Sequence, residues 1–184
     1  MPRECSPITR NLYAWEVHEA WRVFSSRLDY EKVRVHECAT WTDMLDRFGR
    51  RLKRMEAATK PNAITLGNHC YFPVRLMESP TELEGLEQQK LGWLMHELSH
   101  VWQYQRTGWR STLHAIKVQF RHGNQAYDFG GEPGLVLAFQ IGQKLVDFNP
   151  EQQGEICRSF YNRLVHGLDV SAWLPFIEEI QQGG

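Results

Sequence analysis

The sequence predicts an α+β fold that is mostly helical, with a small sheet formed by the first half of the chain. Two observations favour this class. Apolar side chains recur with a period near 3.6 residues in several segments, and shorter segments in the first half alternate apolar and polar residues or are rich in β-branched ones. At 184 residues with 42% hydrophobic side chains, the chain can bury one core, and we expect a single domain over residues 1–184.

Six segments are expected to form helices, because their apolar residues recur at helical spacing or because capping residues frame them. They cover residues 11–27, 40 or 42 to 58, 86–106, 135–148, 151–164 and 171–182. Asn149 and Pro150 are the expected N-cap and first residue of the fifth helix, since asparagine accepts backbone N–H bonds there and proline needs no donor. The Gly-rich residues 122–134 are expected to form a loop, after a shorter helical or irregular piece.

Two segments in the first half predict the strands. Residues 31–37, EKVRVHE, alternate Val33 and Val35 with charged side chains, the pattern of a half-buried strand. Residues 63–74, AITLGNHCYFPV, are rich in β-branched and aromatic side chains around a central Gly-Asn pair. This second pattern predicts either one strand with a bulge or a tight hairpin.

Composition and charge exclude two broad classes. The formal net charge is −1, and basic residues are scattered apart from RFGRRLKR at 47–54, which argues against nucleic-acid binding. The apolar runs are too short to cross a bilayer, so no membrane insertion is expected. The opening residues MPRECSPITR lack the apolar core of a secretory signal, which predicts a protein that is cytoplasmic as synthesised. The four cysteines form no C-x-x-C pair, and we expect free or buried thiols.

The segment HELSH at 96–100 places two histidines four residues apart on an apolar helix. Residues at that spacing share a helix face, so His96 and His100 can both direct a ring nitrogen at one zinc ion about 2 Å away. Glu97, rotated by about 100° from His96, is poorly placed to bind the same ion. It can instead accept a proton from a metal-activated water as general base. We therefore expect a catalytic zinc site with two ligands and a base on one helix.

Such a site needs a third protein ligand. The H-x-x-G-x-x-H continuation of one zinc class would need glycine and histidine where the chain has Gln103 and Arg106, so that class is excluded. Residues 149–156, NPEQQGEI, offer Glu151, our choice as the ligand, and Glu155, which we expect to accept the other N–H of a ligand histidine. The alternative third ligands are Asp128, Glu155, His114, His122 and His166.

Two further roles are expected near the metal. Tyr127, in the Gly-rich loop between the two ligand segments, is our candidate donor to the carbonyl oxygen that gains negative charge during peptide hydrolysis. Tyr161 and His166 are the alternatives for this role. The strand at 63–72 is the hypothesised edge along which an extended peptide substrate adds its backbone.

These motifs resemble those of a known enzyme family. HELSHVWQYQ, preceded by a strand reading ITLGNHCYF and followed about fifty residues later by FNPEQQGEI, resembles the zincin-like metallopeptidases in which glutamate is the third zinc ligand. More narrowly, the chain is similar to bacterial peptidase domains found alone or fused behind spike proteins of type VI secretion systems. The resemblance covers roughly residues 10–166 in the order of the elements, and the HEXXH helix with its WQYQ extension is the most specific part.

The resemblance implies a zincin-like fold, with a small sheet packed on the HEXXH helix. It implies Zn²⁺ held by His96, His100 and Glu151, a general base at Glu97, and a peptide or protein substrate. It also implies use as an antibacterial effector toxin that a secretion machine delivers outside the cell, with a spike protein or an immunity protein as partner. The alternative function is a catalytically inert binding or accessory protein that keeps the zincin fold.

Overall fold

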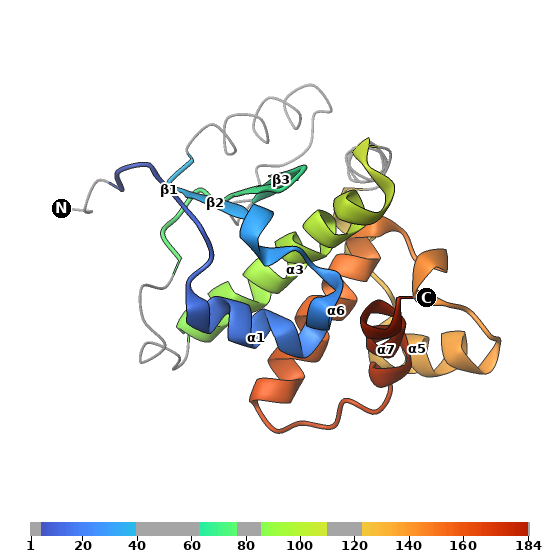
Figure 1. Cartoon of the computed structure of the whole chain (residues 1–184). Coiled ribbons are helices and arrows are strands. Elements are labelled where there is room, and N and C mark those ends of the chain that lie inside the picture. The colour runs from blue at the N-terminus through green and yellow to red at the C-terminus, as the bar shows by residue number, and fades with distance from the viewer. Residues whose placement is uncertain (1–4, 40–62, 77–85, 110–122, 184) are drawn as a thin grey trace.

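In the computed structural model, the described residues are 5–39, 63–76, 86–109 and 123–183 (Figure 1). The α-helices in these ranges are α1 (Ala14–Phe24), α3 (Leu86–Thr107), α5 (Gly131–Gln140), α6 (Pro150–Val165) and α7 (Leu174–Gln182). The strands are β1 (Ile8–Arg10), β2 (Arg34–Glu37), β3 (Ile64–Leu66) and β4 (His69–Tyr71). Short 3-10 turns are η1 (Ser25–Arg27), η2 (Tyr30–Lys32), η4 (Gly123–Tyr127) and η5 (Leu145–Asp147). The fold class is therefore α+β and mostly helical, as the sequence predicts.

The four strands form one sheet in the order β1-β2-β4-β3. β1 pairs antiparallel with β2, β2 pairs parallel with β4, and β3 pairs antiparallel with β4. Among the described strands, β3 therefore lies at one edge of the sheet. Of the two sequence alternatives for residues 63–74, the hairpin is confirmed: Gly67 adopts φ +64 in the turn, a conformation that glycine reaches at little cost.

Helix α3 packs against α6 along one side and against β3 and β4 along another (Figure 1). Since α3 has neighbours on more than one side, its apolar residues are not confined to one stripe. Leu94, Met95 and Leu98 are all at most 1% exposed, and they belong to the main hydrophobic core cluster. At Gly92 a side chain would meet the amide of Asn162 on α6, so the small residue allows the two helices to approach closely.

The start of α6 is fixed by its cap. The Asn149 side chain accepts hydrogen bonds from the backbone N–H groups of Glu151 (2.9 Å) and Gln152 (3.0 Å), and Pro150 is the first helical residue. This confirms the predicted N-cap and first residue. The cap also places Glu151 in the first turn of α6, beside α3.

Several predicted boundaries are wrong, for local reasons. The helix expected at 135–148 begins at Gly131 and ends at Gln140, because Gly130 (φ +80) opens it earlier and Gly142 (φ +76) ends it. The expected loop at 122–134 contains the η4 turn as well as the start of α5. Strand β1 was not predicted. The helix expected to end at 58, the basic run at 47–54 and the piece before residue 122 lie largely or wholly outside the described residues.

The cysteines differ from the prediction of free thiols. Cys5 and Cys38 form a disulfide, with their Cα atoms 5.6 Å apart, whereas Cys70 and Cys157 are free and buried. The antiparallel pairing of β1 with β2 brings the two segments together. Because this contact depends on tertiary structure, the spacing of the cysteines along the chain carries no signal for it.

Candidate metal centre

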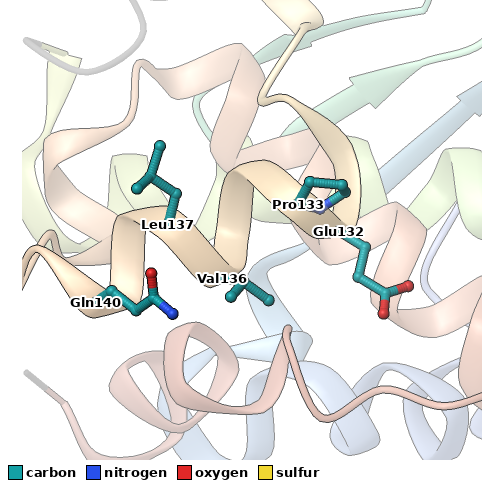
Figure 2. A pocket seen from close by; sticks show the side chains of 5 residues that line it. All are labelled: Glu132, Pro133, Val136, Leu137 and Gln140. Atoms are coloured by element: carbon teal, nitrogen blue, oxygen red, sulfur yellow. The ribbon is translucent and has the colours of Figure 1, made fainter.

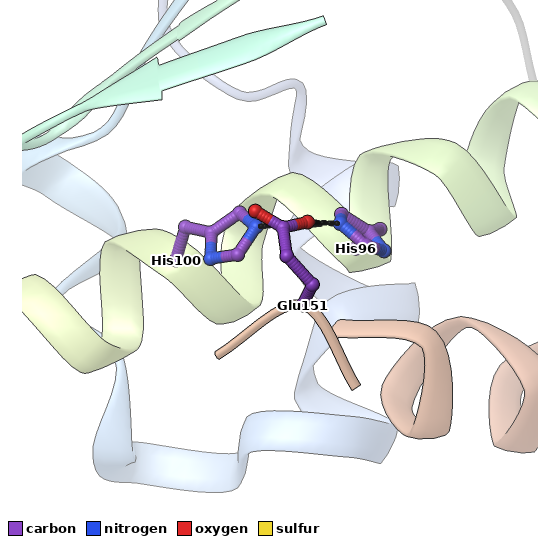
Figure 3. Close-up of side chains that lie close together, drawn as sticks. All are labelled: His96, His100 and Glu151. Atoms are coloured by element: carbon purple, nitrogen blue, oxygen red, sulfur yellow. Dashed lines mark hydrogen bonds and ion pairs between the residues drawn. The ribbon is translucent and has the colours of Figure 1, made fainter. Parts of the chain in front are cut away.

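His96 and His100 project from α3 toward Glu151 on α6, as Figure 3 shows. The two histidine Nε2 atoms lie 3.3 Å apart, and Glu151 Oε2 lies 3.3 Å from His96 Nε2 and 3.5 Å from His100 Nε2. A point equidistant from three atoms at these separations is about 2 Å from each of them, which matches the zinc–nitrogen distance of about 2.0–2.1 Å. The three side chains can therefore hold a metal ion.

The cluster is enclosed but reachable from one side. The side chains of His96 and Glu151 are each 5% exposed, whereas that of His100 is 12% exposed. Three protein ligands would leave at least one coordination position of a zinc ion open for water or substrate. Structural zinc sites usually fill all four positions with protein ligands, whereas catalytic sites keep one open.

Without a metal, the three groups form a charged cluster. Burial lowers the pKa of His96, but its contacts with Glu151 and Glu155 outweigh burial and raise that pKa to about 10. The pKa of His100 is also raised, because the charge of Glu151 outweighs burial. Burial raises the pKa of Glu151, but the two imidazoles outweigh it and hold the pKa well below its usual range. A divalent cation bound by the three side chains would replace the protons on the two histidines and would balance the negative charge of Glu151 in their place.

Gln103, one helical turn beyond His100, orients that histidine. Its side-chain Nε2 donates to the Pro150 carbonyl (3.2 Å) and to Gln153 Oε1 (2.9 Å), both on α6. These two acceptors fix the amide, so Gln103 Oε1 faces His100 Nδ1 at 3.0 Å. Since an amide oxygen only accepts, His100 Nδ1 must carry the proton, and the Nε2 lone pair is left for the metal. Sequence analysis missed this role and used Gln103 only to exclude another zinc class.

His96 is enclosed by α6 on its other side. Glu155 Oε1 lies 3.4 Å from His96 Nδ1, an ion-pair distance, although the buried Nδ1 makes no hydrogen bond of good geometry. The sequence predicts that Glu155 accepts the second N–H of one ligand histidine, and the structure places Glu155 beside His96. At Gly154 a Cβ would lie 2.7–2.9 Å from three atoms of the His96 ring, so the imidazole packs directly on the backbone of α6.

Glu97 faces a different side of α3 from its two histidine neighbours, as the 100° rotation predicts. It is only 4% exposed, and its carboxylate accepts a hydrogen bond from the Thr65 hydroxyl on β3. Its negative charge is close enough to raise the pKa of both His96 and His100. The carboxylate therefore lies beside the metal cluster without being one of its three members.

Tyr127 lies next to the cluster. Its ring centroid is 5.8 Å from that of His96, and the side chain is half-buried. The η4 segment that carries it is tied to the start of α6, because Asn149 Nδ2 donates to the Ala126 carbonyl and Gln152 Nε2 donates to the Asp128 carbonyl. These bonds hold the segment that carries Tyr127 against the first turn of α6, the turn that also contains Glu151.

Among the described residues, three of the alternative candidates, Asp128, Tyr161 and His166, make their contacts away from the metal cluster. Asp128 is exposed, and its Oδ1 accepts a bond from the Gly130 N–H. Tyr161 donates its hydroxyl to Glu19 on α1 (3.0 Å), and His166 Nδ1 contacts the Asn162 carbonyl at the end of α6. His114 and His122 lie outside the described residues. A separate surface hollow on α5, lined by Glu132, Pro133, Val136, Leu137 and Gln140, contains none of the metal-cluster residues (Figure 2).

Comparison with known proteins gives one informative match. The chain is similar to the type VI secretion system spike protein VgrG2b of Pseudomonas aeruginosa. The two are 30% identical over 163 residues, which cover 83% of this chain but 13% of the spike protein. This chain thus spans a small part of the protein it matches. No protein-family model matches the chain, and no solved structure matches it. Among the described residues, no helix is both long and apolar enough to cross a bilayer.

Proposed function

We propose that this chain is a zinc-dependent metallopeptidase with a zincin-like fold. The observation that carries the proposal is the triangle of donor atoms from His96, His100 and Glu151, with side lengths of 3.3–3.5 Å. Two imidazoles and one carboxylate, with coordination positions left open, form a common ligand set of catalytic zinc. The HEXXH helix beneath a small sheet and a third ligand from a later helix support the zincin-like fold.

A zinc ion held by His96, His100 and Glu151 would supply a Lewis acid that polarises a peptide carbonyl and lowers the pKa of a bound water molecule. Glu97 accepts the proton of that water and passes it to the departing amine, so one carboxylate serves both transfers. Tyr127 donates a hydrogen bond to the carbonyl oxygen as negative charge develops on it. Glu97 lies on α3 against Thr65 of β3, and Tyr127 lies on η4, so in this proposal the reacting peptide bond lies between these two side chains.

The edge strand β3 supports an extended peptide as substrate. On one side β3 pairs with β4, and on its other side it forms an edge of the sheet that the described strands make. A peptide that adds to this edge gains backbone hydrogen bonds that do not depend on its side chains. The strand also carries Thr65, the contact of Glu97, so an added peptide lies close to the general base.

The similarity to VgrG2b, whose name identifies it as a type VI secretion spike protein, supports a role in secretion. We extend the proposal to an effector that such a machine delivers out of the producing cell. The disulfide between Cys5 and Cys38 supports this extension, because disulfides persist in oxidising compartments and are rare in the cytoplasm.

The test compares zinc content with turnover. The zinc-loaded wild-type chain and Glu97→Ala are assayed on fluorescein-labelled casein and on a quenched-fluorescent peptide library, with the exposed Glu178→Ala as matched control. We expect about one zinc per chain in all three proteins, as one HEXXH site requires, and turnover only in the wild type and the control. Hydrolysis by Glu97→Ala would refute the base assignment. A wild-type chain that carries no zinc after purification without chelator would favour the inert binding protein.

A further inference from the structure

Thr65 and Cys70 face Glu97 from two neighbouring strands. They are cross-strand partners in the β3–β4 hairpin, and their side chains point toward α3. Thr65 Oγ1 donates to Glu97 Oε2 at 2.7 Å and lies 3.3 Å from the Glu97 backbone carbonyl. All three side chains are buried, with Cys70 at 0%, Glu97 at 4% and Thr65 at 9% exposure. The catalytic carboxylate is thus joined to the sheet through one side-chain hydroxyl.

The direction of this hydrogen bond follows from proton counting. A hydroxyl has one proton, and the shorter of its two contacts with Glu97 is the one to Oε2. Burial raises the pKa of the Cys70 thiol, and the nearby charge of Glu97 raises it further, so the thiol keeps its proton. Because an ionised carboxylate only accepts hydrogen bonds, Thr65 donates its proton to Glu97. In the proposed reaction, Oε1 accepts the proton of the attacking water, because Oε2 is already hydrogen-bonded to Thr65.

We propose that Thr65 is a positioning residue for the general base, a role that rests on the proposed peptidase function. A β-branched side chain on a strand has a restricted χ1 angle, so the hydroxyl is held in place rather than merely available. The neighbours Ile64 and Leu66 point to the opposite face of the sheet. A one-residue change of register would thus remove the hydroxyl from Glu97. The hairpin sets the direction in which the carboxylate points.

The first test compares three zinc-loaded variants with the wild type. Thr65→Val removes the hydroxyl and keeps the shape, Thr65→Ser keeps the hydroxyl, and Thr9→Val removes a hydroxyl from β1 at the far edge of the same sheet. We expect Thr65→Val to keep its zinc and its KM for a cleaved reporter peptide, while kcat falls by about 10- to 100-fold, the range for losing a partner of a functional side chain. Thr65→Ser should recover most of kcat, and Thr9→Val should match the wild type. An unchanged kcat in Thr65→Val, or a Thr65→Ser that carries zinc but is as slow as Thr65→Val, overturns the proposal.

The second test does not depend on turnover. Crystal structures of zinc-loaded wild type and Thr65→Val should show the Glu97 carboxylate in one orientation in the wild type and rotated or divided between orientations in the variant. A carboxylate that stays in place in Thr65→Val contradicts the positioning role. If the carboxylate moves but the wild-type chain cleaves no peptide, the positioning inference stands and the proposed peptidase function fails. The two ideas can therefore fail separately.

Discussion

Replacing Gln103 by leucine, beside a control at Gln153, tests whether Gln103 orients His100 for zinc or only stabilises the contact between α3 and α6. The wild-type amide accepts one hydrogen bond from His100 Nδ1 and donates two to α6, through the Pro150 carbonyl and Gln153 Oε1. Each such bond contributes about 1 kcal/mol net, so Gln103→Leu should lower the free energy of unfolding of the metal-free chain by about 1–3 kcal/mol, since burial of the leucine offsets part of the loss.

The matched control is Gln153→Leu. Gln153 is buried to nearly the same degree, accepts from Gln103 and donates to the Phe148 carbonyl at 2.8 Å, whereas the hydrogen bond with His100 is made by Gln103. Gln153→Leu therefore loses two hydrogen bonds of the same network, and its free energy of unfolding should fall by a similar amount of about 2 kcal/mol. Gln103→Leu removes the acceptor of His100 Nδ1 itself and should lose zinc affinity by about 10- to 100-fold. Gln153→Leu removes one of the two acceptors of the Gln103 amide but keeps the bond to the Pro150 carbonyl, so its loss of zinc affinity should be clearly smaller.

The assay has two parts. Unfolding by urea in the presence of EDTA gives the stability of the metal-free chain, and competition with a chromophoric chelator gives the zinc dissociation constant. If both variants lose stability but bind zinc equally well, the amide does not orient His100, and the tautomer argument is wrong.

Four other predictions concern the ligands, the protons and the disulfide. Glu151→Ala should weaken zinc binding by about 10-fold or more, where 10-fold is the smallest loss typical of removing a residue that only supports a metal ligand. If this variant binds zinc as tightly as the wild type in the same chelator competition, Glu151 is not a ligand. Contacts with Glu151 and Glu155 raise the pKa of His96 to about 10, so zinc must displace the His96 proton near neutral pH. Calorimetry in buffers of different ionisation enthalpy should therefore show that protons are released when zinc binds. The zinc affinity should fall as the pH is lowered. The protonated form of His96 also stabilises the metal-free fold, because its pKa is raised in the folded chain. This contribution is complete below pH 6.5 and is lost as the pH rises toward about 10. Urea unfolding with EDTA at several pH values measures it, with His96→Ala as the control. Reduction of the disulfide, which joins residues 33 apart, should lower the free energy of unfolding by about 3–4 kcal/mol, whereas a Cys5→Ser, Cys38→Ser double variant should not respond to the reductant.

The parts of the site that the sequence predicted are those set by local geometry. Histidines four residues apart on a helix must share a face, so the pairing of His96 with His100 needed no knowledge of the fold. Asn149 and Pro150 mark a helix start by their own chemistry, and this fixed Glu151 in a first turn. That α6 then lies against α3 was an inference from family resemblance, because periodicity does not say which helices meet.

The parts that the sequence did not predict depend on tertiary contacts. Gln103 is an unremarkable amide on a helix until α6 supplies the two acceptors that orient it. Thr65 is one of several β-branched residues in its segment, and only the hairpin register directs its hydroxyl toward Glu97. Strand β1 has three residues and pairs with β2 at one edge of the described sheet, so it is too short to show a pattern of its own.

The measurement that tests the central claim most directly is a crystal structure of the zinc-soaked chain with anomalous data collected on both sides of the zinc absorption edge. The account predicts one strong anomalous peak about 2.0–2.2 Å from His96 Nε2, His100 Nε2 and a Glu151 oxygen, with a water completing the coordination. A peak bound elsewhere on the chain, or a Glu151 carboxylate that points away from a zinc held by the two histidines, would contradict it.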